Sequence, residues 1–325
     1  MPKKKPGKQT SSSKKKSKKP AEDRARFVID QCPHRITGEV NLPWGQLQAP
    51  EHESSLEGDA IYALVMCWDV NSIISQPERI TYTDENEVER RYTVDLLLTL
   101  ETIKKRVEIK PLAVCLKDDV LSRLSSIAKV FASRNEDFDI LTDDVIRQEP
   151  RLDICKRLRG FLKQVVSDEL LSRVGEALRA GPLRISELLV VLGGDQHWAE
   201  ILAMIAHRHL CISWQEPYSK DMQVSLPNHP FQPLTYAALT NSSRFRPLVQ
   251  ELAMGCRPTD QRLLATARAK DQSISLPDAF GVVGALPRRA MQVGRTDGRQ
   301  GDGGDGDGAF SEASSPSHFG RRTVF

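Results

Sequence analysis

The stretch RRYTVDLLLTLETIKKRVEIKPL, from Arg90 to Leu112, decides the fold of the region around it. Its alternating apolar residues predict two β-strands joined by a short charged turn. The apolar face of the first strand is expected to carry Tyr92, Val94, Leu96, Leu98 and Leu100. Pro111 is expected to end regular pairing on the second strand, because proline has no backbone N–H to donate.

A carboxylate in the middle of the first strand, Asp95, needs an explanation. Asp is uncommon in strands, and a buried carboxylate without a partner is costly. In an antiparallel hairpin Asp95 could share its space with Glu108 and hold a divalent cation, and such oxygen ligands suit Mg²⁺ or Mn²⁺. Lys110 lies on the same strand face as Glu108. The three residues together favour metal-dependent hydrolysis of a phosphodiester, with the ammonium orienting the nucleophile or stabilising the pentavalent phosphorus.

The same residue types also have a structural interpretation. A Glu-x-Lys sequence on a strand is commonly a solvated charged face. The spacing Ser54-x-x-Glu57, at the start of the helix predicted over SSLEGDAIYALVMCW, matches a capping box in which Glu57 reaches back to a backbone N–H. On local evidence the capping box is the better explanation of Glu57. The functional alternative is a third acidic ligand delivered by this helix.

Several motifs, taken in order along the chain, resemble those of a known family. They are SSLEGD with Glu57, SIISQP with Gln76, Tyr92-Thr93-x-Asp95, Glu108-Ile109-Lys110-Pro111, and FDILTDDVIRQEPRL. Over roughly residues 51–230 the chain resembles the TnsA-type endonuclease subunit of heteromeric, Tn7-like transposases. That family has the restriction-endonuclease-like fold with a PD-(D/E)xK active site.

The resemblance implies a fold class and a role for each residue. The expected fold is an α/β restriction-endonuclease-like domain, with a mixed central sheet flanked by helices, followed by a mostly helical winged-helix-like domain. Asp95 and Glu108 would be metal ligands, and Lys110 the catalytic lysine. Glu57 would be an accessory acid and third ligand, with Gln76 supporting the motif. The cofactor would be Mg²⁺ or Mn²⁺, as two ions.

The family's reaction is cleavage at the 5′ ends of a transposon during cut-and-paste transposition. The expected partners are therefore double-stranded DNA of the transposon ends, a DDE-type transposase that cuts and joins the 3′ ends, and an AAA+ ATPase regulator.

Val94 stands where the family usually has proline before the aspartate. This departure supports an alternative function, an inactive adaptor that links DNA to transposition partners. A stand-alone restriction-type nuclease would need a recognition element that the sequence does not show.

A second region, residues 151–230, predicts two amphipathic helices and then the order helix, helix, strand, strand. This order suits a winged helix with residues 196–209 as the recognition-like helix. Its core side is expected to carry Trp198, Ile201, Leu202 and Ile205, and its outer side His197, Glu200, Arg208 and His209. His197, Arg208 and His209 are candidate DNA contacts. Contact with DNA and docking of a protein partner are equally open.

The two ends of the chain differ from its middle. Residues 1–26 carry nine Lys and two Arg against Glu22 and Asp23, which predicts a disordered basic tail that could bind phosphates. The predicted divisions are 1–24 basic tail, 25–150 nuclease domain, 151–230 winged-helix-like domain, 231–293 partly helical segment, and 294–325 disordered Gly/Asp/Ser-rich tail. Scattered cysteines and the lack of a long apolar run predict a cytoplasmic protein, which the resemblance places at a bacterial nucleoid.

Overall fold

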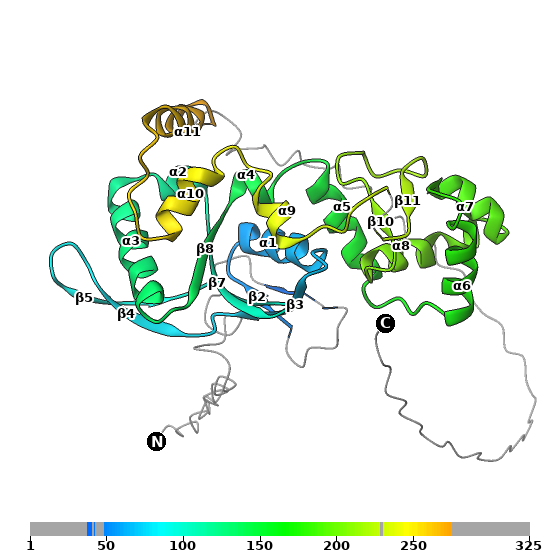
Figure 1. The fold of residues 1–325 in the computed structure, drawn as a ribbon, viewed down its shortest axis with the longest axis horizontal. Helices are drawn as coiled ribbons and strands as arrows, with labels where there is room; N and C mark the ends of the chain where they lie inside the picture. Colours follow the sequence, from blue (N-terminus) through cyan, green and yellow to red (C-terminus); the bar gives the residue numbers. More distant parts are fainter. Residues whose placement is uncertain (1–37, 41, 43–48, 228–229, 275–325) are drawn as a thin grey trace, which may run out of the picture. The chain divides into compact units, whose positions relative to one another are not determined.

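The computed structural model describes residues 38–40, 42, 49–227 and 230–274, and Figure 1 shows their fold. These residues belong to one compact unit. The predicted tails, residues 1–24 and 294–325, lie outside the described residues. Within the described part no single helix could cross a membrane, and only one bent pair of helices, Ile185–Leu192 with Asp195–Ala206, is long and apolar enough when taken together.

A four-stranded mixed sheet with the order β3-β6-β7-β8 lies at the centre. Its strands are β3 (Val70–Ser75), β6 (Leu96–Leu100), β7 (Ile103–Lys110) and β8 (Asp137–Thr142). The pairs β3–β6 and β6–β7 are antiparallel, whereas β7–β8 is parallel. Residues 101 and 102 form the short turn between β6 and β7, because Leu100 pairs with Ile103. This mixed α/β arrangement fits the predicted nuclease-like domain.

Apolar clusters cover both faces of this sheet. Val107 and Ile109 belong to one cluster, whereas Phe138 and Ile140 belong to the other. The first cluster includes α1 (Ser55–Val65) and α5 (Arg151–Leu158), and the second includes α2 (Leu112–Cys115), α3 (Asp118–Ser133) and α10 (Arg246–Ala253). Burial of these side chains supplies the main force that holds the helices on the sheet.

The first strand of the predicted hairpin is divided in two, which corrects the sequence prediction. β5 (Glu89–Thr93) pairs with β4 (Arg79–Thr83) in a separate hairpin, and β6 begins only at Leu96. The cause lies on the opposite strand, where Gln76 has a φ of 48° and Pro77 has no N–H for the ladder. Val94 consequently packs in the α3 cluster rather than with Leu96 as predicted.

The second region has the predicted helices and strands in order, with one strand, β9, that was not predicted. A three-stranded sheet, β10-β11-β9, accompanies α6, α7 and α8. These elements are α6 (Asp168–Ala177), β9 (Leu183–Arg184), α7 (Ile185–Leu192), α8 (Trp198–Ala206), β10 (Cys211–Ile212) and β11 (Gln223–Ser225). The apolar cluster that covers α1 continues into α6, α7 and α8, so the two regions share one core.

Short elements complete the fold. They are β1 (Gly38–Glu39), β2 (Glu51–His52), α4 (Asp143–Ile146), η1 (Arg159–Phe161), η2 (Asp195–His197), α9 (Tyr236–Thr240) and α11 (Gln261–Ile274). The helix predicted near Arg246–Met254 is found as α10. Together α9 and α10 bring the later chain back onto the central sheet, where α10 contacts both α3 and β8.

Candidate active site

The register of the β6–β7 hairpin brings the two predicted carboxylates together. Leu96 and Val107 are the last residue pair at the open end of this hairpin, and Asp95 and Glu108 are the residues next to them, away from the turn. The backbone N–H of Ile109 donates a hydrogen bond to Asp95 Oδ2 at 2.8 Å, which holds this carboxylate at the end of β7. Asp95 therefore lies against the end of the strand that carries Glu108 and Lys110, as predicted.

Glu108 is the most buried member of the group, with 1 % of its surface exposed. Its Oε1 accepts a hydrogen bond from Lys110 Nζ and forms an ion pair with it. Its Oε2 is buried and makes no hydrogen bond of ordinary geometry. Tyr92 is a neighbour of Glu108: burial raises the pKa of the Tyr92 hydroxyl well above its usual value, and the charge and hydrogen bonding of Glu108 raise it further. A buried charged oxygen without an ordinary hydrogen bond carries a desolvation cost, so Oε2 of Glu108 is positioned to accept a cation or a donor from outside the chain.

The electrostatics of the group show a shortage of positive charge. Burial raises the pKa of Asp95 well above its usual range, and the nearby charges of Glu108 and Glu57 raise it further. Burial alone would lower the pKa of Lys110, but the charge and hydrogen bond of Glu108 outweigh it, so the pKa is raised. Lys110 is thus an ammonium at neutral pH, and one ammonium faces several carboxylates.

This group of residues lies inside a segment that matches a known family. Residues 67–143 match the model of the TnsA-like endonuclease N-terminal domain. This stretch of the chain is therefore similar to TnsA-like endonuclease N-terminal domains. The match confirms the predicted resemblance to TnsA-type subunits of Tn7-like transposases, and it contains Gln76, Asp95, Glu108 and Lys110. No curated protein matches the chain.

Glu57 precedes the matched segment of the TnsA-like domain, and its carboxylate is used locally. Ser54 Oγ accepts the N–H of Glu57, while Glu57 Oε1 and Oε2 accept Ser54 Oγ–H and the N–H of Glu53 at 2.9 and 2.7 Å. This is a variant of the capping box predicted from the sequence, because Glu57 reaches back to the N–H of Glu53, one residue before the N-cap Ser54. Glu57 still lies close enough to raise the pKa of Asp95. Its role as a metal ligand stays a prediction.

Gln76 links the cap of α1 to the strand that carries Asp95. Its backbone N–H donates to Asp95 O at 2.8 Å, and its side-chain Nε2 donates to Glu53 Oε1 at 2.8 Å. Both Gln76 and Glu53 are buried. Glu53 was not predicted as part of the site, because the two glutamates in PEHESS follow no periodic pattern that would mark either of them. Gln76 thus connects the two segments without itself lying in the carboxylate group, and its role in supporting the motif stays a prediction.

The carboxylates of the TnsA-like domain fit a hard divalent cation. Among the described residues, no three His, Cys, Asp or Glu side chains form a ready metal cluster. Mg²⁺, however, is commonly held by one or two carboxylates together with substrate phosphate and water. The buried Oε2 of Glu108 and the adjacent Asp95 supply such a pair. Asp95 and Glu108 are thus the residues that would hold the ion.

The candidate DNA contacts lie just outside α8, one before it and two after it, and have three different environments. Arg208 has a φ of 66° and turns inward, where its guanidinium donates to the carbonyls of Val65, Trp68 and Val70. This corrects its predicted outward position, because these bonds fasten the region after α8 to α1 and β3. His197 Nδ1 lies 2.6 Å from Glu200 Oε2, and His209 is exposed. DNA contact by His197 and His209 stays a prediction.

The raised pKa of Asp95 makes a testable statement about stability. A carboxyl whose pKa is higher in the folded chain favours folding in acid, and this contribution is lost as the pH rises through the folded-state pKa. Without metal, Asp95→Asn should therefore raise Tm at neutral pH, and the gain should disappear below about pH 4. Thermal melts across this pH range in EDTA measure it, with exposed Asp153→Asn as control. An unchanged Tm at pH 7 would contradict the electrostatic account.

Proposed function

We propose that this chain is the metal-dependent DNA endonuclease subunit of a heteromeric transposase, and that it hydrolyses phosphodiester bonds at the 5′ ends of a transposon. The observation that carries the proposal is the group of Asp95, Glu108 and Lys110 inside a segment similar to TnsA-like endonuclease domains, with Glu108 Oε2 buried and without an ordinary hydrogen bond. Its partners would be transposon-end DNA, a DDE-type transposase and an AAA+ regulator.

In this proposal two residues would bind the metal and a third would stabilise negative charge on the substrate. Asp95 and Glu108 would hold Mg²⁺ or Mn²⁺, as one or two ions, and the metal would supply Lewis-acid charge and an activated water. Lys110, an ammonium kept charged by Glu108, is placed to stabilise charge that develops on the phosphoryl oxygens. The Ile109 N–H fixes Asp95, so the group is preorganised before DNA arrives.

We propose that residues 168–225 form a winged helix that serves mainly as a docking module. Every residue of α8 from Ile201 to Ala206 is buried, and α8 contacts η1 and α5. A helix covered in this way has little free surface to enter a major groove, whereas a DNA-reading helix presents its side chains to base edges. This burial argues against direct reading of DNA by α8, so docking of a protein partner by other parts of residues 168–225 is the role that we propose.

Metal dependence of cleavage tests the proposed function. The chain, together with its proposed DDE-type transposase partner, should cut the 5′ strands at transposon-end DNA in Mg²⁺ or Mn²⁺ and not in EDTA. Calorimetry with Mn²⁺ gives a second readout, in which Asp95→Asn and Glu108→Gln should each lose binding about tenfold or more. Absence of metal-dependent cutting, with DNA and partner still bound, would instead support the adaptor function.

A further inference from the structure

The β4–β5 hairpin is separate from the central sheet, as Figure 1 shows. Its second strand ends at Thr93, two residues before Asp95 of the proposed active site. Its inner face is apolar: Ile80 and Tyr82 are buried in the cluster that includes α3. Its outer face is polar, because Arg79, Thr81 and Thr83 alternate with those buried residues and are exposed. The hairpin is thus a ribbon with one face fixed to the protein and the other free.

Two arginines lie diagonally opposite each other on the outer face. Arg79 pairs with Thr93, and Thr81 pairs with Arg91, so the four side chains share one side of the ribbon. Within the described residues neither arginine forms an ion pair, and Arg79 Nε donates only to Thr93 Oγ1, at 3.4 Å. The third arginine of the hairpin, Arg90, is instead paired with Asp84 at 2.9 Å.

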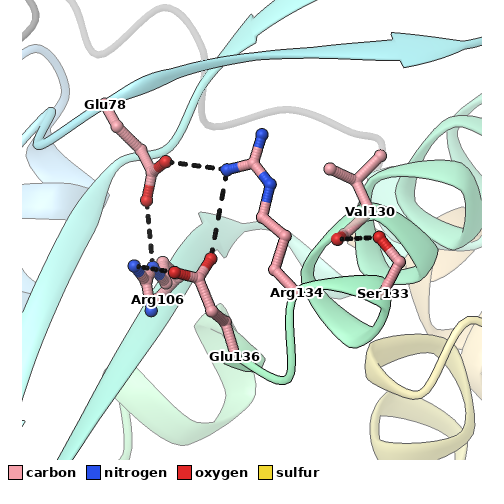
Figure 2. Close-up of polar contacts among 6 residues, drawn as sticks. All are labelled: Glu78, Arg106, Val130, Ser133, Arg134 and Glu136. Carbon is pink, nitrogen blue, oxygen red and sulfur yellow. Dashed lines mark hydrogen bonds and ion pairs between the residues drawn. The ribbon is translucent and has the colours of Figure 1, made fainter.

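The base of this hairpin is held by the four-residue ionic network in Figure 2. Arg106 of β7 donates to Glu78 and Glu136 at 3.0 and 2.7 Å, and Arg134 donates to Glu78 at 3.1 Å. Glu78 immediately precedes β4, whereas Arg134 and Glu136 lie between α3 and β8. A network with several charges in good geometry restrains the hairpin more firmly than a single surface ion pair would.

The distance along the chain from the outer face to Asp95 indicates which part of a bound DNA strand this face would contact. Thr93 and Arg91 precede Asp95 by two and four residues, and at about 3.3 Å per residue the chain between them spans at most roughly 7 and 13 Å. If the phosphate to be cut lies at Asp95 and Glu108, its neighbours along the DNA strand fall within this reach. Guanidinium and threonine hydroxyl groups are common donors to phosphate oxygens.

We infer that the outer face of the β4–β5 hairpin, formed by Arg79, Thr81, Arg91 and Thr93, binds the phosphate backbone of duplex DNA next to the scissile bond. This inference rests on the proposed nuclease function for the identity of the ligand. The face positions DNA and carries no sequence information, because phosphate contacts are common to all sequences. Arg79 and Arg91 supply positive charge on this face, whereas the nearby Arg90, Arg106 and Arg134 are each paired with a carboxylate.

DNA binding in EDTA tests the inference without cleavage. A labelled duplex of mixed sequence and about 30 base pairs, three helical turns, is titrated with the full chain at several salt concentrations. Arg79→Ala/Arg91→Ala should weaken binding about tenfold and lower the salt slope by about two. Arg90→Ala removes the same charge from the same hairpin and should leave both values unchanged. Thr81→Glu, which puts an anion on the face, should also weaken binding.

Two results distinguish the DNA-binding inference from the proposed nuclease function. Equal binding by wild type, Arg79→Ala/Arg91→Ala and Thr81→Glu, with Tm unchanged, would overturn the inference even if Mg²⁺-dependent cleavage is present. Weakened binding in the double variant and Thr81→Glu, but not in Arg90→Ala, would support the surface even if wild type cuts no DNA. Arg79→Lys/Arg91→Lys should retain most of the salt slope, since phosphate accepts either cation.

Discussion

Replacing Lys110 by methionine should lower the rate of 5′-strand cleavage by about a hundred- to a thousand-fold, the usual effect of losing one donor to developing charge. The reason lies in its surroundings, because Glu108 keeps the pKa of Lys110 raised and the ammonium points at the carboxylate group. DNA affinity should change little, since a charge used in the transition state contributes mainly to kcat. Single-turnover cleavage of transposon-end DNA, with affinity measured separately, checks both statements.

A matched control lies on the same strand. Lys104 of β7 has the same charge and is exposed at the far end of the strand, where it pairs with Thr99. Lys104→Met should therefore cut at the wild-type rate. Cleavage by Lys110→Met at that same rate, in saturating Mg²⁺, would show that the lysine is structural and the charged strand face is a solvated one.

The stability of Lys110→Met needs a separate check. Removing the ammonium takes away the hydrogen bond to Oε1 of Glu108, whose Oε2 already has no close partner. Glu108 is almost fully buried, so its charge would then lack compensation. Loss of one partner of a buried ion pair is commonly destabilising. Lys110→Met/Glu108→Gln removes both charges and should recover part of the loss in Tm without recovering cleavage. A misfolded single variant can thus be told apart from a folded and inactive one.

The parts of the site predicted from sequence are those set by local periodicity. Alternation along residues 103–110 placed Glu108 and Lys110 on one face, and a short turn fixed the register that puts Asp95 beside them. The break between Val94 and Asp95 was not predicted, because its cause is Gln76 and Pro77 on another strand. A strand break of this kind depends on a neighbouring strand, which the sequence of the broken strand does not encode.

Long-range polar contacts were the other part that sequence could not supply. Arg208 has the appearance of an exposed residue at the end of an amphipathic helix, yet burial and three carbonyl acceptors from a distant segment hold it inside. Burial lowers its pKa to about 10, a sign of how far it is removed from water. Asp139 in the strand FDILT likewise gave no hint of a partner more than one hundred residues away.

Asp139 carries the second large expected effect, and this one concerns stability. Its Oδ1 and Oδ2 accept a bidentate pair from Arg246 at 2.7 and 2.8 Å, and Oδ2 also accepts Tyr236 Oη–H at 2.9 Å. Asp139 is only 2 % exposed. Asp139→Ala would leave a guanidinium and a hydroxyl buried without their partner, so we expect a loss of about 3–5 kcal/mol in the free energy of unfolding.

Urea unfolding measures this loss, and an exposed ion pair in the same chain is the matched control. Asp153 and Arg157 form an i,i+4 pair on α5 with both side chains about half exposed, and Asp153→Ala should cost less than about 1 kcal/mol. A double variant, Asp139→Leu/Arg246→Met, should recover much of the loss, since apolar packing can replace a buried pair. Equal losses for Asp139→Ala and Asp153→Ala would mean that α9 and α10 are held on the sheet by apolar packing alone.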